Sequence, residues 1–214
     1  MQPLSRLIFG LLALLWATAA LAGGKPGDFD YYLLSLGWSP SWCATTGDRR
    51  GDPQCDAGTG FAFTLHGLWP QYERGWPSDC QSGRRPPTRT ETADMADIMG
   101  SAGLAWHEWQ KHGSCSGQDA PGYFALARWA YQSITVPPEL AHLGRDIRLP
   151  PDLVIKAFRQ ANPALPADGI QVTCTAGRID EVRICLTRDL VPRACGSDVG
   201  RGCGVGSVLM EKVR

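Results

Sequence analysis

Residues 106–115 place two imidazoles, a carboxylate and an ammonium group within one short segment. On a helix, where each residue advances by about 100°, His107 and Lys111 lie one turn apart, and so do Glu108 and His112. The flanking tryptophans indicate that one side of this helix is buried, so a solvated helix end with incidental charges is the less favoured interpretation. The spacing therefore predicts four titratable groups in one cleft.

The spacing of the two histidines also bears on metal binding. A zinc-dependent hydrolase with an HExxH motif needs histidines four residues apart on one helix face. His107 and His112 are five residues apart, which separates them by about 140° around a helix. We therefore expect acid–base chemistry with no metal ion and no other cofactor.

Acid–base chemistry suits this set of side chains. A neutral histidine accepts a proton and a charged one donates a proton between about pH 5 and 7. Lys111 and a protonated His107 would supply positive charge for a developing phosphorane, and Glu108 would hold an imidazole in its charged form or share a proton. RNA needs no more than these groups, because its 2′-hydroxyl is an internal nucleophile beside each phosphodiester.

A further histidine stands in residues 64–70. An apolar strand is expected from Phe61 to His66, ended by Gly67 and Pro70, which places His66 at a strand terminus, where sites are frequent. We expect this segment to lie against residues 106–115 and to supply a second proton-transfer group.

The first 22 residues have the pattern of a secretory signal peptide. Arg6 precedes a largely apolar run from Leu7 to Ala22, which ends in small residues. A membrane anchor is less favoured, because the run is short for a span of about 20 residues. We expect an exported protein, in the periplasm or outside the cell, with no membrane association after removal of the signal. Residues 23–214 are long enough for one domain with a sizeable core.

The chain carries little net charge. It has 21 Lys plus Arg and 21 Asp plus Glu, so removal of Arg6 leaves one more acid than base. Such a chain does not bind polyanions through its whole surface, and any affinity for nucleic acid must come from a local site. A monomer is the default expectation.

Eight cysteines follow the signal, an even number that in an exported chain indicates disulfides. A zinc site is less favoured because no C-x-x-C pair occurs. Hydrophobic patterns predict a mixed α+β domain, a central antiparallel sheet with helices packed on it. The predicted strands are 29–38, 61–66, 170–174 and 182–186, and the predicted helices are 90–99, the catalytic segment before Gly113, 123–134 and 151–162.

Two segments resemble a known family. Phe63–Pro70 and His107–Cys115 are similar to the two active-site segments of the ribonuclease T2 family, the exported transferase-type ribonucleases, and residues 30–43 are similar to the first strand of that family. The likeness extends from Phe29 to Cys203. It implies a metal-independent endoribonuclease that cleaves single-stranded RNA by transesterification to a 2′,3′-cyclic phosphate and then hydrolyses this to a 3′-phosphate.

The resemblance also implies a role for each catalytic residue. His112 would be the general base on the 2′-hydroxyl and His66 the general acid for the leaving 5′-oxygen. His107 would bind phosphate, while Glu108 and Lys111 would stabilise the pentacoordinate state. The residues alone leave open which of His66 and His112 is the base.

Two residues are candidates for binding a base. Trp69 matches the stacking aromatic of the family, with an ordinary core tryptophan as the alternative. Gln71 stands where some members carry an acid that reads adenine, so its amide is expected to contact a base of undefined identity. The alternative function is a catalytically inactive RNA-binding or secreted disulfide-rich binding protein of the same fold. The resemblance further implies the pairs Cys43–Cys55, Cys80–Cys115, Cys174–Cys203 and Cys185–Cys195.

Overall fold

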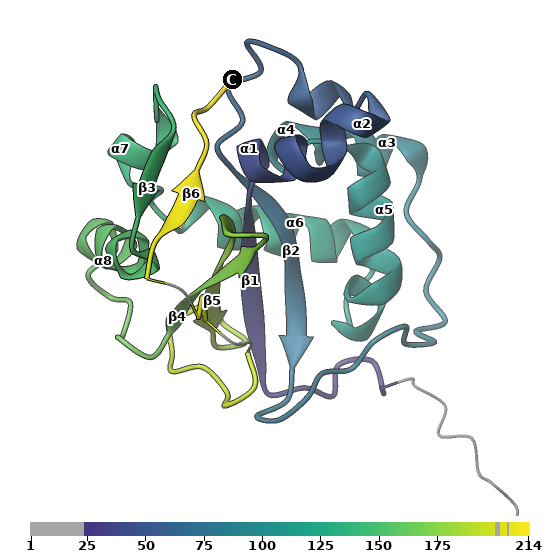
Figure 1. Cartoon of the computed structure of the whole chain (residues 1–214). Coiled ribbons are helices and arrows are strands. Elements are labelled where there is room, and N and C mark those ends of the chain that lie inside the picture. The colour runs from purple at the N-terminus through teal and green to yellow at the C-terminus, as the bar shows by residue number, and fades with distance from the viewer. Residues whose placement is uncertain (1–23, 200–201, 205) are drawn as a thin grey trace, which may run out of the picture.

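A computed structural model describes residues 24–199, 202–204 and 206–214. The predicted signal peptide lies outside these residues. Six strands form one sheet (Figure 1) in the order β2-β1-β5-β6-β3, and β4 also pairs with β5. The strands are β1 Tyr31–Trp38, β2 Phe63–Gln71, β3 Ile147–Leu149, β4 Ile170–Thr175, β5 Arg178–Leu186 and β6 Val208–Met210.

The sheet is antiparallel, as predicted, except for one parallel contact between β5 and β6. β1 lies between β2 and β5 and is buried on both faces, where its side chains belong to two separate hydrophobic clusters. Leu34, Leu36 and Trp38 belong to the main core under the helices, whereas Tyr31 and Leu33 pack in a smaller cluster on the opposite face. The second face carries the polar groups considered below.

The helices gather mainly on one face of the sheet. α5 runs beside β2, and α6 crosses β1 and β2 (Figure 1). The helices are α1 Ser39–Trp42, α2 Asp48–Arg50, α3 Arg89–Ala93, α4 Ala96–Met99, α5 Ala102–Lys111, α6 Ala120–Gln132, α7 Pro138–Ala141 and α8 Pro151–Ala161. A π-helical turn follows α1 at Cys43–Gly47, and 3-10 turns lie at Pro53–Cys55 and Gly113–Cys115.

The helix predicted over residues 90–99 is two helices, α3 and α4. The Arg128 guanidinium, on α6, donates a hydrogen bond of 2.6 Å to the Asp94 carbonyl between them and is paired with Asp97. The Asp94 carbonyl, between the two helices, thus accepts a hydrogen bond from a side chain of another helix. The chain leaves helical geometry at Gly100 and Ser101, and α5 begins at Ala102, where the Ser101 side chain accepts a hydrogen bond of 3.1 Å from the Leu104 amide and caps the helix.

The strand predicted to end at His66 continues to Gln71, so the placement of His66 at a strand terminus is wrong. Pro70 is tolerated because β2 is an edge strand of the sheet, where a residue without a backbone N–H breaks no continuous ladder. β5 also begins earlier than predicted, at Arg178, directly after the turn residues Ala176 and Gly177, which both have positive φ.

Four disulfides join the pairs that the resemblance implied: Cys43–Cys55, Cys80–Cys115, Cys174–Cys203 and Cys185–Cys195. Cys115 closes the turn after α5, and Cys185 lies at the end of β5. In the part of the chain that the structure describes, no helix is both long and apolar enough to cross a membrane.

Candidate active site

A cleft of about 460 Å³ lies against β2, the end of α5 and the loop after Cys195. It brings together all seven residues that the sequence singled out for catalysis or base binding, which come from two segments about 40 positions apart. These residues are His66, Trp69, Gln71, His107, Glu108, Lys111 and His112.

A β-bulge puts the two ends of the β2 motif on one face of the sheet. Ser35 of β1 pairs with Gly67 and the next residue, Leu36, pairs with Leu65, so His66 has no partner in the ladder. Successive residues of a regular strand alternate between faces, and His66 and Trp69 would then point to opposite sides. The extra residue resets the alternation, so both side chains face the cleft.

His66 lies between two carboxylates. Its Nδ1 contacts Oε1 of Glu181, on β5, and its Nε2 is 3.6 Å from Oε1 of Glu108, on α5. Burial lowers the pKa of His66, but the hydrogen bond and charge of Glu181 and the charge of Glu108 outweigh burial, and the pKa is raised above its usual value. The charged form of this imidazole is therefore favoured.

Glu108 is buried, with 1% of its surface exposed, and accepts a hydrogen bond of 2.6 Å from the Trp69 indole N–H. Burial raises the pKa of Glu108 to about 7, against the lowering effect of His66, of the Trp69 hydrogen bond and of Lys111. Gly67 makes room for this contact, since a Cβ there would collide with both Glu108 and Trp69. The carboxyl group can therefore exchange a proton near neutral pH.

His112 follows the last residue of α5 and has left helical geometry, with φ −122° and ψ −48°. Its ring stacks on Trp69 at 5.0 Å between centroids, and no described residue hydrogen-bonds to its buried Nδ1. Burial lowers the pKa of His112 to about 3, helped by the positive charges of Lys111, His66 and His107. The neutral form of this imidazole is therefore favoured.

The remaining predicted residues occupy the edges of the cleft. His107 and Lys111 are exposed on α5. The Lys111 carbonyl accepts a hydrogen bond of 2.9 Å from the Asp79 amide, which holds the loop of Cys80 beside the end of the helix. Gln71 is buried, and its amide donates 3.0 Å to the Pro70 carbonyl.

Sequence reasoning missed Trp76, Arg183 and Asp198, which line the cleft, and Glu181, which contacts His66 from β5. Glu181 and Arg183 lie on one face of β5, where two charges two positions apart in an apolar strand were the available signal. Arg183 pairs with Glu181 at 2.7 Å and lies 5.4 Å from the centroid of the Trp69 ring. Trp76 and Asp198 lie in loops and carry no comparable pattern.

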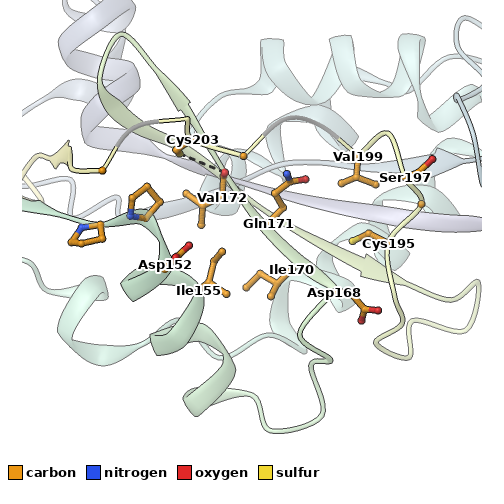
Figure 2. Close-up of a pocket in the computed structure, with 15 residues that line it drawn as sticks. Asp152, Ile155, Asp168, Ile170, Gln171, Val172, Cys195, Ser197, Val199 and Cys203 are labelled. Atoms are coloured by element: carbon orange, nitrogen blue, oxygen red, sulfur yellow. Dashed lines mark hydrogen bonds between the residues drawn. The ribbon is translucent and has the colours of Figure 1, made fainter.

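A second cavity, of about 540 Å³, lies between β4, the start of α8 and the C-terminal loop (Figure 2). Asp152 and Asp168 line it, and its described lining residues include no histidine, lysine or arginine. A polyanion would meet negative charge there, so the first cleft is the candidate active site. No group of three potential metal ligands occurs among the described residues of the chain.

The chain is similar to known ribonucleases over most of its length. The model of the Ribonuclease T2 family matches residues 29–195. A ribonuclease of Aeromonas hydrophila is 42% identical over 97% of this chain and 97% of its own length. Ribonuclease DdI of Dictyostelium discoideum is 29% identical, over 86% of this chain and 88% of its own length.

Solved structures show the same fold. An RNase-related protein from Calystegia sepium has a TM-score of 0.71 at 21% identity, with 89% of this chain and 100% of the other covered. The family match spans both segments that line the cleft. The chain therefore belongs to the ribonuclease T2 family of RNA-cleaving enzymes.

Proposed function

We propose that this chain cleaves single-stranded RNA by metal-independent transesterification followed by hydrolysis, with His112 as general base and His66 as general acid. The observation that carries the proposal is the opposite surroundings of these two imidazoles in one cleft. His66 faces the carboxylates of Glu181 and Glu108, whereas His112 is buried beside positive groups. Environments that shift two titratable groups in opposite directions support an assignment of acid and base.

In the first step, neutral His112 takes the proton of the 2′-hydroxyl as the 2′-oxygen attacks phosphorus. Charged His66 gives the proton on its Nε2 to the 5′-oxygen as the bond from phosphorus to that oxygen breaks. The products are a 2′,3′-cyclic phosphate and a free 5′-hydroxyl. In the second step water replaces the 5′-hydroxyl, the two imidazoles exchange roles, and a 3′-phosphate results.

The phosphate would lie at the C-terminal end of α5. Lys111 and His107 offer donors from the exposed edge of the cleft and would neutralise charge on the phosphoryl oxygens. Glu108, with its pKa raised to about 7, exists partly as the neutral acid at neutral pH. In that form it donates a hydrogen bond to a phosphoryl oxygen and adds no negative charge beside the phosphate.

The base would bind on the side of Trp69 away from α5. Trp76 and Arg183 line the same cleft and offer a second aromatic surface and a guanidinium plane for a base. Gln71 is close but has its amide turned to the Pro70 carbonyl. These contacts provide stacking without a defined choice of base.

Substitution of either proton-transfer residue tests this function. His66→Ala and His112→Ala should each lower kcat/KM on single-stranded RNA by about 10²- to 10⁴-fold, with the thermal unfolding midpoint little changed. His142→Ala is the matched control, because His142 is exposed and lies outside the cleft. Wild-type digests should contain 2′,3′-cyclic phosphate ends and should proceed unchanged in EDTA.

Either of two results would reject the proposal. If His112→Ala kept activity within tenfold of the wild type, His112 could not be the general base. If the wild type lost activity in EDTA, the reaction would need a metal ion. A wild-type chain that binds RNA without cleaving it would favour the catalytically inactive alternative. We further propose that the protein is exported as a monomer after cleavage behind Ala22, which the mass of the secreted chain would test.

A further inference from the structure

Glu181 is a buried carboxylate that the proposed reaction does not use directly. It lies on β5, two strands away from His66, with β1 between them. Only 6% of its surface is exposed. A buried charge of this kind is costly unless it is paired, so its partners indicate what it does.

The side chain of Glu181 reaches β2 across β1 beside a glycine position. Glu181 pairs with Gly37 of β1, and Gly37 pairs with Thr64 of β2, so the three residues form one row across the sheet. At Gly37 no side chain fills the space above the row, and a Cβ there would have no neighbour closer than 3.9 Å. Oε1 of Glu181 contacts Nδ1 of His66, which lies two residues after Thr64 on β2.

This contact orients the imidazole. An ionised carboxylate only accepts hydrogen bonds, so the Nδ1–H group of His66 donates a hydrogen bond to Glu181. Nε2 is the nitrogen left to face Glu108 and the cleft. A carboxylate in this position selects the tautomer and the ring orientation of a catalytic histidine. Nε2 is therefore the atom that can hold the proton for a leaving group.

Arg183 fixes the carboxylate in turn. Its Nε and Nη2 donate to Oε2 of Glu181 at 2.8 and 2.7 Å, and its Nη1 donates 2.7 Å to the Val199 carbonyl. Burial raises the pKa of Glu181, but His66 and Arg183 outweigh burial and lower it to about 2. The group is therefore ionised throughout the range in which the enzyme would work.

We propose that Glu181 is a positioning residue that holds the His66 imidazole with Nε2 directed at the leaving 5′-oxygen, and that Arg183 keeps Glu181 in place. The inference rests on the proposed function, in which His66 is the general acid. The other groups that act on His66 are Asp180 of β5 and Glu108 and His112 at the α5 side. Of these described groups, Glu181 is the one that contacts Nδ1.

The test compares two substrates that differ in their need for an acid. A dinucleoside monophosphate such as UpA has a poor leaving group that must be protonated, whereas uridine 3′-(4-nitrophenyl phosphate) releases a stable anion. Glu181→Gln should lower kcat/KM on UpA by about 10- to 100-fold, as is typical when a group orienting a reactive histidine is lost. On the nitrophenyl ester the loss should stay below about threefold.

The pH profile is the second readout. Loss of the negative charge favours the neutral form of His66, so the alkaline limb of kcat/KM on UpA should move to lower pH by about one unit. Glu181→Asp, which keeps the charge on a shorter side chain, should restore part of both effects. Glu211→Gln is the matched control. Glu211 is largely buried and pairs with Arg178, which lies on β5 like Glu181, and both residues of this pair are outside the cleft.

Equal losses on both substrates, with an unmoved alkaline limb, would overturn the inference and leave Glu181 a structural residue. Failure of the proposed function looks different, since His66→Ala would then retain activity on UpA. An unfolded Glu181→Gln variant is recognised by loss of activity on the nitrophenyl ester as well and by its thermal midpoint. In that case Glu181→Asp, which keeps the charge on a shorter side chain, must show the same substrate difference at smaller size.

Discussion

The two histidines proposed as acid and base differ in the groups that surround each imidazole. His66 has a carboxylate on each ring nitrogen, which stabilises its charged form, whereas His112 is buried against Trp69 beside Lys111. Both histidines are recognisable in the sequence, but their shifts in pKa arise from partners that are remote in the chain. The sequence alone left their roles open for that reason, and Glu181 escaped notice because it is 115 positions from His66.

The low pKa of His112 has a consequence for activity in acid. A general base must be neutral, so the acid limb of kcat/KM should lie well below pH 6.5, towards the pKa of about 3. Lys111→Gln removes a neighbouring positive charge, which should raise the pKa of His112 and move the acid limb to higher pH by about one unit.

Stopped assays on UpA between acid and neutral pH would measure this limb. Lys156→Gln, on α8 and outside the cleft, is the control for loss of a lysine. An acid limb at the same pH in Lys111→Gln and the wild type would contradict the assigned cause, whatever the loss in rate.

At the scale of elements, local sequence patterns predicted most strands and helices, but not the irregularities within them or the points where they end. The dense aromatic and apolar run of residues 29–38 and the apolar stripe of residues 123–134 correspond to β1 and α6 within a few positions. The bulge at His66 depends on the register between β1 and β2, which no local pattern encodes. The three-residue strands β3 and β6 are too short to show a period and were not predicted.

The fit between β2 and α5 can be tested at Gly67. A Cβ there collides with Glu108 and Trp69, so Gly67→Ala should displace both and lower kcat/KM by about 100-fold, because small misplacements in a site are costly. Overpacking should also cost about 1–3 kcal/mol of unfolding free energy. Gly144→Ala is the control, since a Cβ at Gly144 has no described atom within 4 Å. Near wild-type activity on RNA for Gly67→Ala would show that the site is not close-packed there.

For the whole molecule, two of the four disulfides hold segments next to an active site in which Glu108 and His112 are buried. Cys80–Cys115 closes the turn after α5, and Cys185–Cys195 anchors the loop that carries Asp198 and Val199 to the end of β5. These links stabilise the fold against the cost of burying titratable groups. Stability and catalysis are therefore coupled through the protonation of the same side chains.

That coupling predicts opposite effects of two buried groups on stability between pH 4.5 and 6.5. The pKa of Glu108 is raised from 4.5 to about 7, so its contribution is complete below 4.5 and is lost as the pH rises through about 7. The pKa of His112 is lowered from 6.5 to about 3, so its contribution is complete above 6.5 and is lost as the pH falls through about 3. In the wild type the two slopes largely cancel in this window.

Removing one group should therefore expose the slope of the other. In urea unfolding, the stability of Glu108→Gln should rise with pH by up to about 1.4 kcal/mol per unit between pH 4.5 and 6.5, and that of His112→Asn should fall by a similar amount. The lowered pKa values of Glu91 and Glu181, both to about 2, take effect below this window. Parallel curves for both variants and the wild type would mean that Glu108 and His112 titrate alike in the folded and unfolded chain, and the electrostatic basis for assigning acid and base would fall with them.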